Sequence, residues 1–163
     1  MTVRIQTYND AAHRAQVLAL WREVFGYSAA HNDPELSLSN KLAQGDGLLF
    51  VALGGAQGGA QGGAQGGAQG GAQGGAQVVG TAMAGYDGHR GWLYSIAVQP
   101  EHRRQGLGAA LVQRAEQALT SLGCVKINLQ LLASNEATVA FYQRLGYAVE
   151  PRISMGKALV TRS

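Results

Sequence analysis

The stretch SIAVQPEHRRQGLGAAL, residues 95–111, decides the expected fold of this chain. An apolar strand ends within it, a basic turn with Arg103 and Arg104 follows, and Gly106 and Gly108 open a helix. The first N–H groups of a helix lack intrahelical partners, and the helix dipole makes that end partly positive. Glycines let an anion approach the backbone, and guanidinium groups add charge beside it. The stretch therefore predicts a pyrophosphate site.

Other phosphate-binding loops do not match this stretch. A Walker loop needs Gly-x-x-x-x-Gly-Lys followed by Ser or Thr, which is absent here. A dinucleotide fingerprint needs a third glycine, but residues 109–111 read Ala-Ala-Leu. The spacing that remains is Arg103-x-x-Gly106-x-Gly108.

A second motif, ASNEATVAFYQRLGY at residues 133–147, follows after one helix and one strand. Asn135 starts its helix, and the helix carries Tyr142. Together the two motifs resemble those of the GNAT superfamily of N-acetyltransferases, whose acetyl-CoA signature precedes an Asn-initiated helix that ends in Leu-Gly-Tyr or Leu-Gly-Phe. Within that superfamily, NDPE at 32–35 and GYDGHRG at 85–91 resemble the YpeA-like branch.

The resemblance implies acetyl-CoA as the cosubstrate and no metal. The pantetheine arm would lie where the strand holding 96–98 splays from the strand holding 129–131. A backbone N–H near Ile96 and Ala97 would bind the thioester oxyanion. Asn135 would hydrogen-bond the pantetheine or fix the local backbone, with helix capping alone as the alternative. The implied cofactor-binding residues are Ile96, Ala97, Val98, Arg103, Arg104, Gln105, Gly106, Leu107, Gly108, Ala109, Asn135 and Tyr142.

The implied chemistry is direct acyl transfer to a neutral amine. Tyr142 occupies the position of the family's usual general acid. Some relatives place a glutamate five residues before the motif asparagine, where this chain has Gln130, which cannot take up a proton. Asp87, His89 and Glu35 are the other candidate bases, although each is expected to be structural or solvent-exposed. The sequence therefore leaves the base open.

Hydrophobic periodicity predicts the element order β-α-α-β-β-β-α-β-α-β-β. The crossover from Val98 through the long helix to Val125 predicts one parallel pair in an otherwise mostly antiparallel sheet. The expected fold is therefore α/β (α+β), with a mixed central sheet flanked by helices. The expected strands cover 3–7, 47–53, 78–84, 92–98, 125–132, 147–149 and 153–155, and the helices begin after Asn9 or Asp10, at Pro34, at Gly106 and at Glu136.

Six copies of Gly-Gly-Ala-Gln occupy residues 54–77. Half of these residues are glycine, so ordering them costs much entropy and buries no large apolar side chain. We interpret the repeat as an expanded loop between two antiparallel strands, because closure entropy rises slowly with loop length. Neutral expansion is favoured over a lid or tether. Residues 1–163 are expected to form a single N-acetyltransferase domain.

The composition favours a globular protein, with 46% hydrophobic and 14% charged residues. A net charge of +3 without interleaved aromatic and basic residues argues against nucleic acid. One cysteine, no signal peptide and no long apolar run predict a cytoplasmic protein away from membranes. The expected partners are acetyl-CoA and an unidentified amine, bound by a monomer or homodimer. A non-catalytic CoA sensor is the alternative that Gln130 keeps open.

Overall fold

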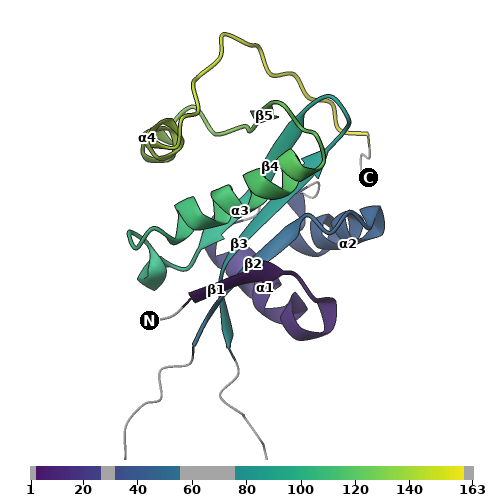
Figure 1. Cartoon of the computed structure of the whole chain (residues 1–163), viewed down its shortest axis with the longest axis vertical. Coiled ribbons are helices and arrows are strands. Elements are labelled where there is room, and N and C mark those ends of the chain that lie inside the picture. Colours follow the sequence, from purple (N-terminus) through teal and green to yellow (C-terminus); the bar gives the residue numbers. More distant parts are fainter. Residues whose placement is uncertain (1–2, 27–31, 56–75, 160–163) are drawn as a thin grey trace, which may run out of the picture.

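In the computed structural model, which describes residues 3–26, 32–55 and 76–159, five strands form one sheet in the order β1-β2-β3-β4-β5 (Figure 1). Neighbouring strands are antiparallel up to β4, and β4 and β5 are parallel. The mixed sheet expected from the sequence is therefore confirmed. Its elements are β1 Val3–Thr7, α1 Asp10–Phe25, α2 Pro34–Gln44, β2 Leu49–Gly54, β3 Gln77–Tyr86, β4 Gly91–Val98, η2 Pro100–His102 (a 3-10 turn), α3 Leu107–Ser121, β5 Ile127–Asn128 and α4 Glu136–Arg144.

Helices cover both faces of the sheet, with α1 and α2 on one side and α3 on the other (Figure 1). Strand β2 shows the division. Leu49 and Val51 pack with α1 and α2, whereas Phe50 and Ala52 pack with α3, because successive side chains of a strand point to opposite faces. A strand covered on both faces is apolar throughout, as the sequence of β2 is.

The helix ends follow the expected capping chemistry. The Asn9 side chain accepts a hydrogen bond from the Ala12 N–H at 3.1 Å, and the Asp33 side chain caps α2. Gly26 and Gly45 end α1 and α2 in the left-handed conformation that glycine adopts without strain. These boundaries place α1 firmly against the sheet, where it contributes to the functional region described below.

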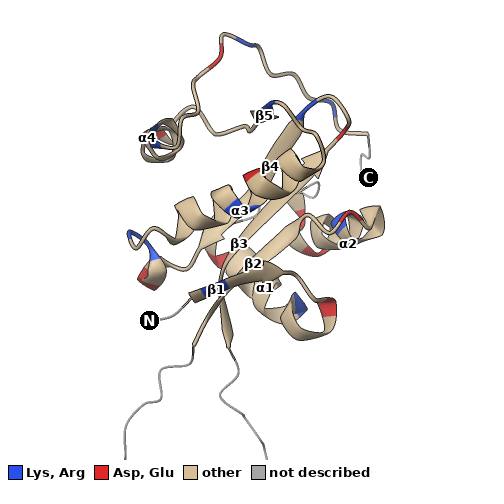
Figure 2. Cartoon of the chain, viewed as in Figure 1, with Lys and Arg blue, Asp and Glu red and all other residues tan. Residues whose placement is uncertain are grey.

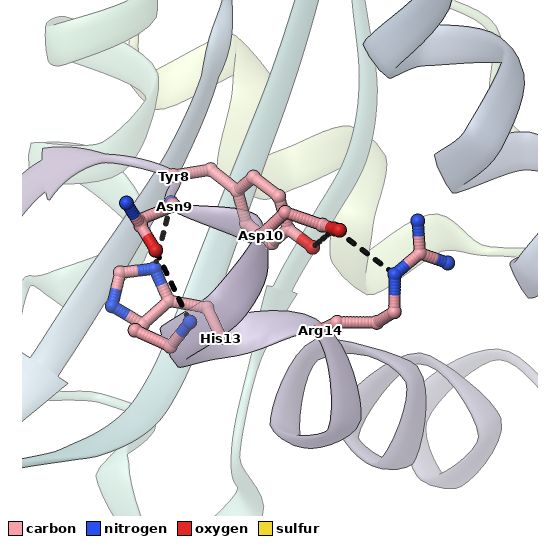
Figure 3. Close-up of polar contacts among 6 residues, drawn as sticks. Tyr8, Asn9, Asp10, His13 and Arg14 are labelled. Carbon is pink, nitrogen blue, oxygen red and sulfur yellow. Dashed lines mark hydrogen bonds and ion pairs between the residues drawn. The ribbon is translucent and has the colours of Figure 1, made fainter.

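The start of α1 depends on a neutral histidine (Figure 3). The Asn9 backbone N–H donates to His13 Nδ1 at 2.9 Å, so this nitrogen carries no proton. His13 is 4% exposed, and burial lowers its pKa. On the outer side, Asp10 accepts from the Tyr8 hydroxyl at 2.6 Å and from Arg14 Nε at 2.9 Å. Protonation of His13 Nδ1 would remove the acceptor of this hydrogen bond. It would also place a positive charge at the positive end of the helix dipole.

The two ends of the repeat lie in the sheet. Gly54 pairs with Gln77 at the end of the antiparallel β2–β3 ladder. The expectation of a loop between antiparallel strands is therefore consistent with its anchor points, while residues 56–75 lie outside the described residues. Among the described residues, no helix combines the length and hydrophobicity that a membrane crossing requires.

The C-terminal part differs from the predicted one. Strand β5 is limited to Ile127–Asn128 instead of 125–132, and the expected strands at 147–149 and 153–155 are wrong for the described chain. Residues 150–154 run beside β5 through side chains: Glu150 accepts from Lys126 Nζ and Asn128 Nδ2, and Gln130 donates to Ser154 Oγ. Side-chain bonds replace the backbone ladder because the two-residue β5 exposes few backbone groups for pairing.

Candidate functional site

Strand β4 carries a β-bulge near its carboxyl end. Met83 of β3 pairs with Tyr94 and Thr81 pairs with Ala97, so β4 has one more residue than β3 between these pairs. Ser95 takes a φ of 46° there, which a non-glycine side chain rarely adopts. Bulges redirect the backbone and concentrate near active sites. The sequence did not predict this one.

A buried chain of hydrogen bonds holds the bulge. The Trp21 indole Nε1–H of α1 donates to Thr81 Oγ1 at 2.9 Å, and the Thr81 hydroxyl donates to the Ser95 carbonyl oxygen at 2.8 Å. Trp21 and Thr81 are both fully buried. The helical periodicity predicts Trp21 on the apolar face of α1 but does not reveal this role. The available signal was a single hydroxyl residue, Thr81, inside the otherwise apolar run of β3.

Beyond the first residues of β4, the parallel pair separates. Gly91 pairs with Ile127 and Trp92 pairs with Asn128 of β5. Among the described residues, no later residue of β4 pairs with β5. The later part of β4 therefore has no ladder partner on this side within the described residues. The half-buried side chains on the two segments are Ile96, Val98, Leu129 and Leu131. This separation is the splay that the expected fold requires.

The turn between β4 and α3 presents a run of backbone donors. Among the described residues, the N–H groups from Arg104 to Ala109 have no hydrogen-bond partner, and the first helical bond comes from the Ala110 N–H to the Gly106 carbonyl at 3.0 Å. Arg104, with φ 59°, and Gly106, with φ 79°, bend the chain so that these groups follow one another. No side chain caps α3. Unpaired amides at a helix start form an anion-binding site.

Basic groups lie beside these amides (Figure 2). Arg103 and Arg104 are exposed, and Arg103 Nε donates to the Val98 carbonyl at 3.0 Å. This bond holds the Arg103 stem against the end of β4. Gln105 is oriented by a bond from its Nε2 to the Glu101 carbonyl at 3.1 Å. An open hollow of about 440 Å³ adjoins the turn, lined by Gly106, Ala109, Ala110, Val112, Gln113, Glu116 and Leu145.

The two glycines of the motif have different surroundings. A Cβ atom at Gly106 would meet nothing within 4 Å, so this residue faces open space and is required for its left-handed backbone. A Cβ atom at Gly108 would lie 3.3 Å from Phe141 Cζ. Gly108 therefore allows α4 to approach the start of α3. The sequence alone had suggested phosphate approach for both glycines.

Helix α4 brings Asn135 and Tyr142 to this region. Asn135 Oδ1 accepts from the Thr138 N–H at 3.2 Å, so the side chain caps α4, which was the alternative interpretation of this residue. Tyr142 belongs to the same apolar cluster as Leu107 and Leu111 of α3. Its ring meets Phe141 and Tyr147 edge-on, with centroids 5.0 and 5.5 Å away. Packing therefore orients the ring of Tyr142.

The Tyr142 hydroxyl is available for chemistry. The residue is 6% exposed, and the hydroxyl makes no hydrogen bond with the described residues, yet it is not sealed from solvent. Burial of the side chain raises its pKa to about 12. The hydroxyl is therefore protonated at neutral pH and can donate to a leaving group. Tyr147 differs, because its hydroxyl already donates to Glu116 Oε1 at 2.7 Å.

The candidate bases lie elsewhere or are occupied. Asp87 Oδ1 accepts from the His89 N–H at 2.8 Å and the Arg90 N–H at 2.6 Å, and these bonds hold its pKa below the usual range. Arg90, whose carbonyl accepts from the Asp87 N–H, precedes Ser95 by five residues, and strands rise about 3.3 Å per residue, so this turn lies roughly 16 Å from the bulge. Glu35 stands in the first turn of α2, 4.0 Å from Arg22, and Gln130 bonds to Ser154. Asp87 is therefore distant from the bulge, and Glu35 and Gln130 already have side-chain partners.

The described ranges contain no cluster of metal-binding side chains. No three His, Cys, Asp or Glu residues gather there closely enough to hold a metal ion.

Comparison with known proteins identifies the family of this chain. The acetyltransferase (GNAT) family matches residues 59–147. An acetyltransferase of Sodalis glossinidius is 32% identical over 161 residues, covering 98% of this chain and 96% of that protein. The chain therefore belongs to the acetyltransferase (GNAT) family.

Solved structures share the fold at lower identity. The ribosomal-protein-S18-alanine N-acetyltransferase of Escherichia coli superposes with a TM-score of 0.63 at 23% identity, covering 89% of this chain and 77% of that one. A chain of the NatC complex bound to Gag peptide and CoA gives a TM-score of 0.69 at 17% identity, covering 89% of this chain and 84% of that one. The chain therefore shares its overall fold with these acetyltransferases.

Proposed function

We propose that this chain is an acetyl-CoA-dependent N-acetyltransferase that acetylates a primary amine of a small molecule, peptide or protein by direct attack. The observation that carries the proposal is the run of N–H groups from Arg104 to Ala109 at the start of α3, which have no partner within the described residues and lie beside two arginines in the connection that follows the bulged β4. Such a run fits a diphosphate. CoA bound to the NatC complex, one chain of which has a similar fold, supports the choice of cofactor.

The cofactor-binding roles follow the chain. The diphosphate of acetyl-CoA would bind the amides from Arg104 to Ala109 and the two guanidinium groups. The pantetheine arm would lie between β4 and the segment at 129–131, against the half-buried Ile96 and Val98. The free amide nitrogen of Asn135 can donate to the pantetheine, because its oxygen is used for capping.

The reaction needs one new bond and one broken bond. The neutral amine nitrogen attacks the thioester carbonyl carbon. The resulting oxyanion accepts a hydrogen bond from the backbone N–H of Ile96. When the oxyanion collapses, the C–S bond breaks and its electron pair stays on sulfur. The Tyr142 hydroxyl gives its proton to this thiolate. The surplus proton of the acetylated nitrogen passes to solvent, from which Tyr142 is reprotonated.

Two measurements test the proposal. Calorimetry at low salt should show CoA binding, and thiol release from acetyl-CoA should depend on an added amine from a panel of small amines and peptide N-termini. If CoA produces no heat, the cofactor assignment is wrong. If CoA binds but no amine supports release, the protein is the CoA sensor that Gln130 left open.

The remaining assignments extend the same proposal. We infer a YpeA-like acetyltransferase of a single domain spanning 1–163, with residues 54–77 as an inserted loop. The alignment with the Sodalis protein over 98% of the chain supports one domain. A chain with one cysteine, Cys124, cannot form an internal disulfide, which supports the cytoplasm as its location. A monomer and a homodimer are both compatible, and sedimentation would decide between them.

A further inference from the structure

The orientation of one peptide group in the bulge of β4 is set by a side chain of the neighbouring strand β3. Ser95 and Ile96 together stand opposite the single β3 residue Ala82, so neither has a regular ladder partner, and within the described residues β5 pairs with β4 only at Gly91 and Trp92. The ladders therefore leave the Ser95–Ile96 peptide without the usual restraint. Its carbonyl oxygen is instead held at 2.8 Å by the Thr81 hydroxyl.

The two hydrogen bonds that link Trp21, Thr81 and Ser95 can run in one direction only. An indole N–H can only donate, so Thr81 Oγ1 must accept from Trp21 Nε1. The one proton of the Thr81 hydroxyl is then free to point at the Ser95 carbonyl, which can only accept. Both Trp21 and Thr81 are fully buried, so water does not compete for these bonds. The indole thus selects one rotamer of the hydroxyl, and the hydroxyl selects one orientation of the peptide.

The orientation of the carbonyl sets the orientation of the next amide. A trans peptide is planar, and its N–H points opposite to its C=O. The Ser95 carbonyl points across the sheet toward Thr81 of β3, so the Ile96 N–H points away from β3, toward the edge of β4 from which β5 separates after Trp92. The Ile96 side chain packs against the cluster that contains Tyr142. The amide therefore faces the gap proposed for the pantetheine arm, next to the cluster that holds the proposed acid.

We propose that Trp21 and Thr81 are positioning residues that aim the Ile96 N–H at the thioester carbonyl oxygen of bound acetyl-CoA. This inference rests on the proposed function and adds to it a buried pair on α1 and β3 that touches neither the cofactor nor the amine. Without the Thr81 hydroxyl the peptide can rotate, and the donor is lost at the moment when negative charge develops on oxygen. The φ of 46° at Ser95 fits this role, since strained backbone persists where its surroundings hold it.

The test compares Thr81→Val, which is of similar shape and lacks the hydroxyl, with Thr81→Ser, which keeps it. Removing one oxyanion donor typically lowers kcat by about 10²-fold, so Thr81→Val should lose on the order of tenfold to 10²-fold in kcat. Thr81→Ser should restore most of that loss. Because CoA without its acetyl group has no thioester carbonyl to accept a hydrogen bond from the Ile96 N–H, its Kd should stay unchanged in both variants. Trp21→Phe, which removes only the indole donor, should give a smaller loss of kcat.

A spectroscopic measurement makes the test independent of turnover. The infrared carbonyl stretch of acetyl-CoA labelled with ¹³C at the thioester carbonyl should move to lower frequency on binding wild type and Thr81→Ser. In Thr81→Val it should return toward its value in solution. Leu38→Ala, a fully buried change in α2, controls for lost stability and should leave the stretch as in wild type.

The outcomes separate the two proposals. If the wild-type stretch moves on binding and Thr81→Val moves it equally, the positioning role is wrong while the function stands. A loss of kcat in Thr81→Val that Thr81→Ser does not repair, with equal losses in Leu38→Ala, also overturns it. If the wild-type protein binds no acetyl-CoA, the proposed function fails, and this inference fails with it.

Discussion

The polar groups near the two ends of β4 differ in whether they have hydrogen-bond partners. At the amino end, Asp87 accepts from two backbone N–H groups and lies 3.4 Å from Trp92 Nε1, and the Gly91 N–H donates to the Lys126 carbonyl at 2.9 Å. At the carboxyl end, a bulge interrupts the ladder, and the amides from Arg104 to Ala109 have no partner within the described chain. At the amino end the polar groups bond within the fold, and at the carboxyl end the amides remain available for the proposed cofactor.

This difference supports the location proposed for the cofactor site. The hairpin at the amino end carries acidic and basic side chains, but their bonds are satisfied by the turn itself. The carboxyl end carries few special side chains, and its capacity comes from backbone geometry at Ser95, Arg104 and Gly106. Apart from glycines, Ser95 and Arg104 are the residues with positive φ in the described part of the chain. Strain of this kind marks functional sites.

The largest contrast is expected between two tyrosines. Tyr142→Phe removes the proposed acid at the carboxyl end and should lower kcat by about 10²-fold, while CoA affinity and melting temperature change little because the hydroxyl has no partner among the described residues. Tyr86→Phe at the amino end loses a hydroxyl that bonds only to backbone carbonyls and should leave kcat unchanged. Steady-state kinetics with the best amine of the panel provides the measurement. Equal kcat in both variants would remove Tyr142 from the mechanism.

The arginines of the basic turn should control cofactor affinity. Charge-assisted hydrogen bonds contribute about 1.5–3 kcal/mol, so Arg104→Ala, which removes one of the two guanidinium groups, should weaken CoA binding by roughly 10- to 10²-fold. Arg90→Ala in the hairpin removes a similar charge from the other end and should leave the Kd unchanged. Calorimetry at several salt concentrations checks both variants. Comparable weakening by Arg90→Ala would indicate a general charge effect instead of a site.

A matched pair of glycines tests backbone geometry with equal strain at each end. Gly106 has φ 79° and Gly88 has φ 86°, and a Cβ atom added at either position would have no atom within 4 Å. Replacing either by valine should cost about 1–2 kcal/mol of stability, since both need a left-handed backbone. Only Gly106→Val should also weaken CoA binding, by about tenfold for a loss of about 1.4 kcal/mol. If Gly88→Val weakens it equally, the proposed diphosphate site is misplaced.

Asp87 should matter for the hairpin and little for turnover. Asp87→Asn keeps an oxygen for the turn and removes the carboxylate, so kcat at pH 7 should remain within about twofold, less than the 10²-fold expected of a general base. Asp87→Ala, which removes the acceptor, should lower the melting temperature. A loss of kcat in Asp87→Asn with an unchanged melting temperature would make Asp87 the missing base.

The smallest effect concerns His13, which lies at the start of α1 and at neither end of β4. Its pKa is lowered by burial from an ordinary value of 6.5, so its neutral form stabilises the fold fully above that pH. Stability should then decline as the pH falls from 6.5 toward the lowered pKa. His13→Gln should flatten this decline in melting temperature between neutral and acidic pH. An equally steep decline in the variant would assign the loss to other groups.

Several features were predictable because they depend on neighbours in sequence. Asn9 and Asp33 cap helices through bonds spanning two or three residues, and the Asp87–Gly88 turn joins β3 to β4 as expected. The two short motifs were sufficient to identify the acetyltransferase resemblance. The length of β5 and the closing strands were not predictable, since pairing in a sheet depends on a distant edge rather than on local apolar alternation.

The amino-acid sequence by itself determined the helix and strand types, the basic turn and the family, since local periodicity, capping and short motifs are encoded over a few residues. Only the tertiary structure decided that Gly108 faces Phe141, that the bulge falls at Ser95, and that Trp21 meets Thr81 across 60 positions of sequence. Such contacts arise when whole elements pack together, and the side-chain pattern within one element carries no record of them.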